Sequence, residues 1–239
     1  MKERRRSEAG LAASGRPGRR FHMKHFKWTW QDTVAVGAGL LTVIFALVNY
    51  DRLPAQLPSH IGISGEFDNF WGKNSVIGLF GALGIFMPAL IQLTRAIDPK
   101  RERYFKFENA HAMIRLAISL IFDSALMVSV LYGLGVSLPA NRIAMAIMGL
   151  AFMVMGNYMP QIKDNYFLGV KTPWTLASPE VWRRTHRLTG TLWTISGVII
   201  FLGAFVPVKG YGYILPVVVL LSCLIPYVYS WFDYRRLKA

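Results

Sequence analysis

The stretch AMIRLAISLIFDSALMVSVLYGLGV, residues 112–136, decides the fold class of this chain. It exceeds the roughly 20 mostly apolar residues that a helix needs to cross the bilayer's hydrocarbon core. Further stretches meet or approach this length at residues 33–50, 75–94, 143–159, 189–206 and 213–232. A spanning segment must pair its own backbone groups, and none of these stretches alternates as a barrel strand would. The sequence therefore predicts an all-α polytopic membrane protein with six transmembrane helices.

The composition agrees, because 53% of the residues are hydrophobic and only 17% are charged. Six spans place both termini and two loops on one side. Of the 27 Lys and Arg, nine lie in residues 1–27, five in 95–110, five in 160–188 and three in 233–239. The loops of the other side carry Arg52, Lys73, Arg142 and Lys209. The positive-inside rule then predicts cytoplasmic N and C termini.

The net charge of +14 is interpreted as topology and attraction to anionic membrane lipids. Direct binding of nucleic acid is not expected, because no basic stripe lies on a soluble fold. Residues 1–27 are predicted to be a basic, disordered cytoplasmic tail, and they lack the apolar core of a secretory signal peptide. Since Met23 precedes KHFKWTW, a natural start for a membrane protein, residues 1–22 are interpreted as an extension without a functional role.

The first outer loop, residues 51–73, reads DRLPAQLPSHIGISGEFDNFWGK. Its Pro and Gly residues predict turns rather than a helix, with a tight turn at Ser64-Gly65. The loop is interpreted either as a cap on the helix bundle or as a surface for an external peptide. A metal site is not expected, because the loop has no second His beside His60. The candidate toxin-facing residues are Pro54, Pro58, His60, Gly65, Glu66, Asp68 and Lys73.

A second unusual segment, residues 156–188, reads GNYMPQIKDNYFLGVKTPWTLASPEVWRRTHRL. Pro160 closes the fourth span, and Ser178-Pro179-Glu180 is typical of a helix start. An amphipathic helix is expected to run from there into the fifth span, with its arginines facing headgroups or water. We call residues 160–188 the signature loop. The candidate residues in and beside it are Asn157, Pro160, Lys163, Asn165, Gly169, Lys171, Thr172, Pro173, Trp174, Thr175, Trp182, His186 and Arg187.

These residues together resemble the motif of the SdpI family, bacterial membrane proteins named for immunity to a secreted killing peptide. The outer loop, through Pro54, Pro58, His60, Gly65, Asp68 and Lys73, is similar to the DUF1648 module that often precedes it. The expected organisation is a DUF1648-like module over residues 28–110 and an SdpI-like module over 111–239. Many family members have Arg where this chain has Lys171, and Lys lacks the two-pronged guanidinium.

The resemblance implies an immunity or signalling protein of the bacterial cytoplasmic membrane, without catalysis, cofactor or metal. The implied partners are membrane lipids, a secreted peptide toxin outside and a transcriptional repressor inside. Two alternatives stay open from the residues themselves. One is a proton-coupled transporter or exporter of a peptide or small solute. The other is a membrane enzyme working around Lys171 and His186, where neighbouring arginines are expected to lower the pKa of His186.

Two ionisable residues lie inside the predicted third span. Asp123 is near its centre, where an Asp costs about 2.5–3.5 kcal/mol on insertion scales, so it is a functional candidate. It is expected to be protonated or bonded to Thr191, Thr194 or Ser196 of another helix. Arg115 lies eight residues earlier, about 12 Å along a helix axis, and is expected to snorkel toward the cytoplasm.

Overall fold

The computed structural model describes residues 26–62, 64–206 and 211–238. The predicted tail over residues 1–27 lies outside them apart from its last two residues, and so does Lys209. The chain is mostly helical. Its helices are α2 (Trp30–Val48), α3 (Lys73–Ile97), α4 (Glu108–Gly133), α5 (Ala140–Tyr158), α6 (Pro173–Ala177), α7 (Pro179–Gly203) and α8 (Tyr211–Lys238). Short 3-10 turns lie at Tyr50–Arg52 (η1), Arg101–Lys106 (η2) and Met159–Gln161 (η3).

Five helices among the described residues are long and apolar enough to cross a membrane. They are Trp30–Val48, Lys73–Ile97, Glu108–Gly133, Ala140–Gln161 and Leu215–Lys238. The predicted fifth span, residues 189–206, falls mainly in α7, whose first turns are polar and charged. The membrane-protein class is therefore supported by five helices, and the sixth span stays a prediction.

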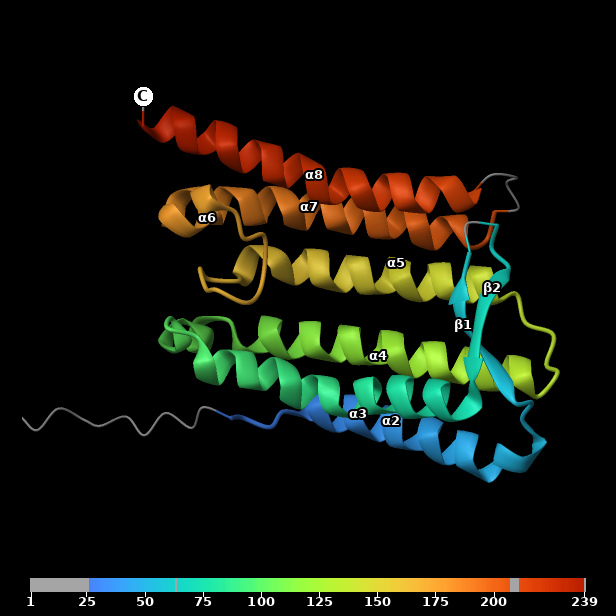
Figure 1. Ribbon diagram of the computed structural model, residues 1–239. Helices are drawn as coiled ribbons and strands as arrows, with labels where there is room; N and C mark the ends of the chain where they lie inside the picture. The colour runs from blue at the N-terminus through green and yellow to red at the C-terminus, as the bar shows by residue number, and fades with distance from the viewer. Residues whose placement is uncertain (1–25, 63, 207–210, 239) are drawn as a thin grey trace, which may run out of the picture.

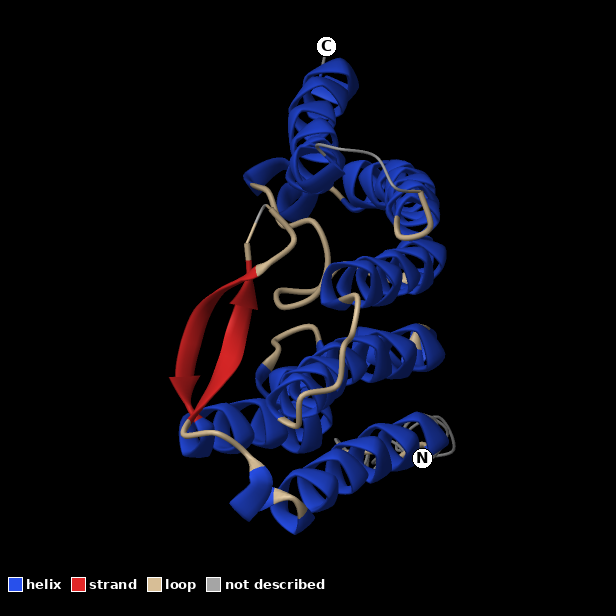
Figure 2. Ribbon diagram, turned by 90° about the vertical axis from the view of Figure 1, so that its right-hand side faces the viewer, coloured by secondary structure: helices blue, strands red, loops and turns tan. Residues whose placement is uncertain are grey.

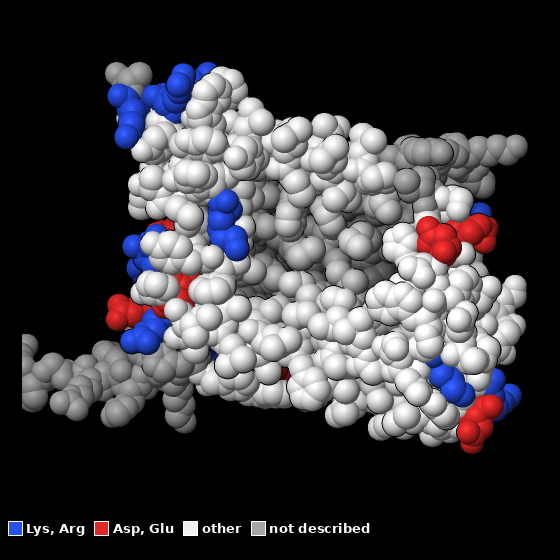
Figure 3. Space-filling view, in the orientation of Figure 1, with Lys and Arg blue, Asp and Glu red and all other residues white. Residues whose placement is uncertain are grey.

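The long helices lie side by side in a layered bundle, from α2 and α3 at one edge to α8 at the other (Figure 1). The start of α2 and the end of α8 lie at the same end of the bundle, together with α6 and the signature loop. We call this the signature end and the opposite one the hairpin end. On the face shown in Figure 3, charged side chains gather toward these two ends and the broad middle is mostly uncharged. This pattern is the one expected of a bundle that sits in a bilayer.

The outer loop departs from the all-α prediction. It forms an antiparallel hairpin of β1 (Gln56–Ile61) and β2 (Phe67–Gly72), which lies along one side of the helices at the hairpin end (Figure 2). The predicted tight turn is confirmed, since Gly65 has φ +84° and its N–H donates to the Gly62 carbonyl at 2.9 Å. The strands were missed because the register is irregular around His60, so no clean alternation marks them.

Glycines set the distance between helices, as small residues do inside membranes. A Cβ on Gly149 of α5 would lie 2.6 Å from the Phe201 backbone nitrogen of α7, and one on Gly156 would lie 2.6 Å from that of Thr194. In the half of the bundle formed by α2, α3 and α4, a Cβ on Gly81 would overlap Val43, and one on Gly84 would overlap Asp123. The close approach of these helices therefore depends on glycine at each contact.

A buried ion pair joins α2 to α4. Arg115 is 2% exposed and binds Asp32 with two hydrogen bonds, Nε to Oδ1 at 2.9 Å and Nη2 to Oδ2 at 2.8 Å. Its Nη1 also lies 2.5 Å from Nδ1 of His111. The prediction that Arg115 snorkels to the cytoplasm is thus wrong, because Asp32 on a neighbouring helix satisfies the guanidinium inside the bundle.

Removing one member of this pair should destabilise the protein strongly. Breaking a buried pair leaves an uncompensated charge and costs about 3–5 kcal/mol. We expect Asp32→Leu and Arg115→Met each to lower the thermal unfolding midpoint in detergent. The double variant should be more stable than either single one, since it buries no lone charge. A double variant whose loss equals the sum of the two single losses would contradict this account.

Candidate functional site

The exposed surface of the hairpin carries an acidic and an aromatic part. His60 Nδ1 and Asp68 Oδ1 lie 2.7 Å apart across the two strands, with both side chains more than half exposed. Glu66 beside the turn is exposed. Phe70 and Trp71 of β2 are 39% and 41% exposed, as expected of rings that seat a loop at the membrane interface. The hairpin thus offers two carboxylates and two aromatic rings to its surroundings.

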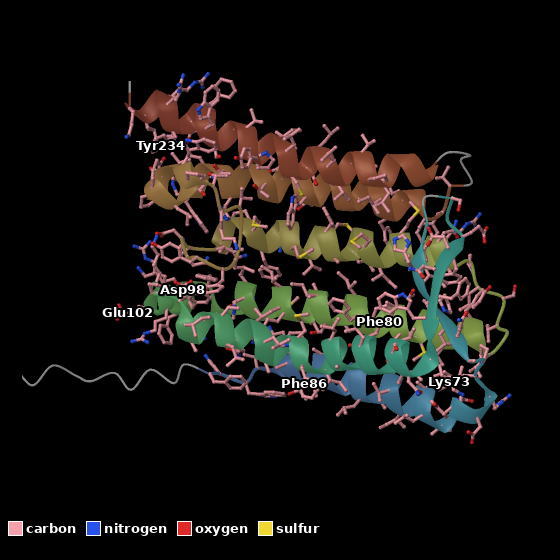
Figure 4. The ribbon with its side chains drawn as sticks, in the orientation of Figure 1. Lys73, Phe80, Phe86, Asp98, Glu102 and Tyr234 are labelled. Atoms are coloured by element: carbon pink, nitrogen blue, oxygen red, sulfur yellow. The ribbon has the colours of Figure 1, made fainter. Side chains whose placement is uncertain are left out.

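The other predicted residues of this loop hold the hairpin in place. The Ser129 hydroxyl of α4 donates to the carbonyl of buried Pro58 at 2.7 Å. Lys73 Nζ donates to the carbonyls of Tyr50 and Leu53 at 3.0 and 3.3 Å, and lies 3.9 Å from the centre of the Tyr50 ring. Figure 4 places Lys73 at the hairpin end, at the start of α3. Lys73 therefore ties the loop before β1 to α3.

Both halves of the bundle contact the hairpin. On one side, the ring of Phe67 packs edge-on against Tyr132 of α4, with centroids 4.6 Å apart. Exposed Pro54 lies beside Gly133, where a Cβ would come 3.3 Å from the proline ring. At the tip, a Cβ on Gly65 would lie 2.8 Å from Asn141 at the start of α5. The hairpin, which lies in the predicted module 28–110, therefore packs across α4 and α5 of the predicted module 111–239.

Asn165 organises the signature loop from a fully buried position. Its Oδ1 accepts hydrogen bonds from the backbone N–H groups of Phe167 and Leu168 at 2.9 and 2.6 Å. Its Nδ2 donates to the carbonyls of Lys163 and Leu168 at 2.9 and 3.0 Å. Four backbone groups of one turn thus bond a single amide, and the Tyr104 hydroxyl of the loop between α3 and α4 adds a fifth bond at 3.4 Å. Asn165 is a structural residue that folds the loop.

The loop between α3 and α4 packs onto this turn at the signature end, where Figure 4 places Asp98 and Glu102. Oδ2 of Asp98 accepts from the Tyr104 hydroxyl at 2.9 Å and from the Tyr166 N–H at 3.0 Å. Asp164 pairs with Lys100 at 2.9 Å and also contacts Arg103. Burial, together with Asp98, raises the pKa of Tyr104. Two loops far apart in sequence therefore form one folded unit.

His186 is buried and uses both of its ring nitrogens. Nδ1 donates to the Trp182 carbonyl at 2.9 Å, and Nε2 accepts from the Val170 N–H at 3.1 Å. The ring stacks on Trp182 with centroids 4.0 Å apart. Burial lowers the pKa of His186 to about 4. The lowered pKa agrees with the sequence analysis, but its cause is burial and not the neighbouring arginines, and no nitrogen is free to act as a base.

Gly169 allows the chain to pass over this histidine. It has φ +108°, which side chains rarely adopt, and a Cβ there would overlap Nε2 of His186. Trp182 is fixed in turn by the bond from its indole nitrogen to the Ile162 carbonyl at 2.9 Å. Gly169, Trp182 and His186 therefore pack together as one unit.

The helix start predicted at Ser178-Pro179-Glu180 is confirmed, whereas the short helix α6 was not predicted. Thr172 caps α6, with Pro173 at its first position, and the Thr172 hydroxyl lies 3.0 Å from that of Ser230 on α8. Trp174 packs edge-on against Tyr227, also on α8. Ser178 caps α7, which continues as one helix to Gly203 rather than as a separate interfacial helix. Hydrogen bonds from Arg183 and Arg184 lower the pKa of Glu180 to about 2.

Several predicted residues of the signature loop stay on the surface and are available to a partner. Lys171 Nζ donates to the Phe167 carbonyl at 2.9 Å and is exposed, so it clamps no buried anion. Tyr166 and Phe167, which the sequence analysis did not single out, are 45% and 37% exposed in the same loop. The remaining exposed members are Asn157, Pro160, Lys163, Pro173 and Arg187, while Thr172, Thr175 and Trp182 are buried.

Asp123 does not reach α7. It is 4% exposed and faces α2 and α3, where a Cβ on Gly39 would lie 3.0 Å from Oδ1 and one on Gly84 would overlap it. The predicted bonds to Thr191, Thr194 or Ser196 are therefore wrong. Neither carboxyl oxygen has a hydrogen-bond partner among the described residues. An ionised carboxylate is costly in such surroundings, so the site favours the neutral acid.

Sequence reasoning missed the polar contacts at the signature end of α2, α3 and α4. Besides the pair of Arg115 and Asp32, they include Glu108, which bonds Lys27 at 2.6 Å and Arg95 at 3.4 Å. Gln92 donates to the Lys27 carbonyl at 2.7 Å. The available signal in the sequence was Asp32, an acidic residue in the first turn of α2 that needs a partner when buried. The described residues contain no group of three or more His, Cys, Asp or Glu able to hold a metal ion.

The chain is similar to two protein families and to one protein of known role. Residues 161–230 match the SdpI/YfhL protein family, and residues 38–90 match a domain of unknown function, DUF1648. The resemblance to the SdpI family is confirmed. The chain is also 29% identical over 202 residues to "Immunity protein SdpI" of Bacillus subtilis (strain 168), covering 83% of this chain and 93% of that protein. No solved structure matches it.

Gly169→Ala should disrupt the signature loop. The added methyl group would collide with His186, so the loss should exceed the about 1–2 kcal/mol of backbone strain alone. Gly135→Ala is the matched control, because Gly135 has φ +79° and open space around it. Tryptic cleavage after Lys163 or Lys171 should accelerate in Gly169→Ala only. Equal cleavage of the two variants would contradict the packing role of Gly169.

The stability of the protein should fall in mild acid because of His186. The unfolded side chain takes up a proton below about pH 6.5, whereas the folded site resists it down to about pH 4. The free energy of unfolding therefore keeps its full value above pH 6.5, and His186 lowers it by about 3 kcal/mol as the pH falls toward 4. Unfolding midpoints measured across this range should fall less steeply in His186→Gln. The control, Arg187→Gln on the exposed face of the same helix, removes no group that titrates in this range and should keep the wild-type slope. A wild-type slope in His186→Gln would refute the assignment.

Proposed function

We propose that this chain is an integral membrane immunity protein that protects the cell from a secreted membrane-active peptide. The observation that carries the proposal is the similarity to an immunity protein over nearly the whole length of both chains. The proposed topology has six spans, with residues 189–206 as the fifth, and both termini in the cytoplasm. The membrane is proposed to be the bacterial cytoplasmic one, with modules over residues 28–110 and 111–239.

The hairpin is the proposed site of contact with the peptide. It lies at the end of the bundle opposite the signature loop. Under the proposed topology, this hairpin end faces the outside. Its exposed Glu66 and Asp68 provide negative charge, and Phe70 and Trp71 provide apolar surface at the same place. A membrane-active peptide that has both cationic and apolar groups would find partners for each. Bound there, it would be kept from permeabilising the membrane.

The signature end is the proposed docking surface for a cytoplasmic repressor. Exposed Tyr166 and Phe167 stand next to the exposed cation Lys163 on a turn that Asn165 holds rigid. Exposed aromatic side chains are enriched at protein-binding surfaces. The signature loop packs on α8 through Thr172 and Trp174, so a shift of helices in the bundle would reach this surface.

Neutralising the acidic residues of the hairpin should abolish protection. Sensitive cells would express wild type, Glu66→Gln/Asp68→Asn or the control Asp51→Asn, and be challenged with a secreted killing peptide of the family. Asp51 is exposed at the same end of the bundle but lies in η1, before the strands. We expect wild type and the control to survive and the double variant to lose most of its protection at equal membrane levels. Unchanged protection by the double variant would remove the hairpin from the proposal.

A second candidate function, proton-coupled export of a peptide or small solute, is favoured by one observation. Asp123 is a buried carboxyl in the middle of α4 without a hydrogen-bond partner among the described residues, and intramembrane acids of this kind serve proton relays.

Asp123→Asn separates the two functions. Asparagine keeps the shape of the neutral acid but cannot release a proton. We expect the variant to insert and to protect cells as wild type does, because sequestration needs no proton transfer. Loss of protection together with loss of proton-driven peptide efflux from inverted vesicles would favour the exporter instead.

A further inference from the structure

A cavity of about 210 Å³ lies beneath the hairpin, between α3, α4 and α5. Its roof is β1, from Pro58 to Ile61, together with Phe67 of β2. Phe80 of α3 closes one wall. The other walls come from α4 between Ile121 and Ser129, with Ala125 among them, and from α5, with Ala144 among its lining residues. Both predicted modules therefore contribute to it.

The cavity runs along the helices and opens on their side. Its α4 residues extend from Ile121 to Ser129, which is about 12 Å of helix axis. Figure 3 shows the surface hollowed between the two halves of the bundle, from near the hairpin toward the middle. Three of the lining helices are long and apolar enough to span a bilayer. The cavity thus points along the membrane normal, which is the direction of the lipid acyl chains.

The polarity of the lining changes along this direction. Near the middle of the bundle the walls are almost wholly apolar. At the hairpin end they include Ser59, whose buried hydroxyl has no hydrogen-bond partner among the described residues, and His60. His60 holds the exposed carboxylate of Asp68 at 2.7 Å, so negative charge lies beside this end. A ligand that fits has an apolar chain below and a polar, positively charged group above.

We propose that this cavity binds the part of one acyl chain nearest the headgroup, in a phospholipid from the hairpin-side leaflet, with the rest of the chain continuing into the bilayer. An ammonium-bearing headgroup lies beside His60, Asp68 and the Ser59 hydroxyl. The chain fills the cavity and gains dispersion contacts with its apolar walls, and the headgroup ammonium donates charge-assisted hydrogen bonds to the exposed Asp68 carboxylate. The binding site is a property of the folded bundle and does not depend on immunity to a peptide.

The test is native mass spectrometry of the full-length protein, delipidated in detergent and then supplied with dioleoyl phosphatidylethanolamine. Ala125→Trp and Ala144→Trp fill the cavity from two different helices. Ala82→Trp is the matched control, since Ala82 is exposed on α3 outside the cavity. We expect wild type and the control to retain one lipid, and both cavity variants to retain at least fivefold less. Dioleoyl phosphatidylglycerol should be retained more weakly than the ethanolamine lipid by wild type but equally by Asp68→Asn.

Three results would overturn the proposal. Equal retention by all four proteins would show lipid on the outer surface of the bundle only. Equal retention of the two lipids by wild type would remove the headgroup assignment. No lipid retention by wild type, with a secreted killing peptide retained instead and lost in the cavity variants, would assign the cavity to the peptide. Each protein must show the same monodisperse elution, and the two independent cavity variants keep the test decisive if one fails to fold.

Discussion

The ion pair between Asp32 and Arg115 is the interaction on which the first half of the bundle depends. A guanidinium inside a bilayer is tolerated only when its donors are satisfied. Asp32, 83 residues earlier in the sequence, accepts two hydrogen bonds from Arg115. The pair fixes the height and rotation of α2 against α4, and Glu108 and Gln92 add links to the segment before α2 and to α3. With one end fixed in this way, Asp123 can sit against Gly39 and Gly84 farther along the same helices.

The second half of the bundle is held by different means. Its α5 and α7 approach through Gly149 and Gly156, where backbone meets backbone, and the signature loop seals their ends through Asn165, Trp182 and His186. The two halves meet along α4 and α5, and the hairpin crosses that junction from Tyr132 to Asn141. This arrangement leaves the cavity between the two halves, and the hairpin that roofs it touches both α4 and α5.

The sequence predicts the parts of this structure that arise from local pattern. Long apolar runs locate the helices, Ser64-Gly65 locates the turn, and Ser178-Pro179-Glu180 locates the start of α7. It does not predict features that arise from distant contacts. The partner of Arg115 lies 83 residues away, and the two strands carry a bulge that breaks their alternation. Lys73 and Asn165 look like ligand contacts in the sequence because both are polar, yet each satisfies backbone carbonyls of the fold. Charge alone therefore does not separate binding residues from structural ones.

The most direct test of the account is site-specific photo-crosslinking in cells that survive a challenge with a secreted killing peptide of the family. A photoreactive residue would replace Phe70 on the hairpin or Phe167 on the signature loop, both of which are exposed. The account predicts that the peptide crosslinks from position 70 and not from position 167. Crosslinking from position 167, or from neither position while the cells are protected, would contradict the claim that the hairpin meets the peptide.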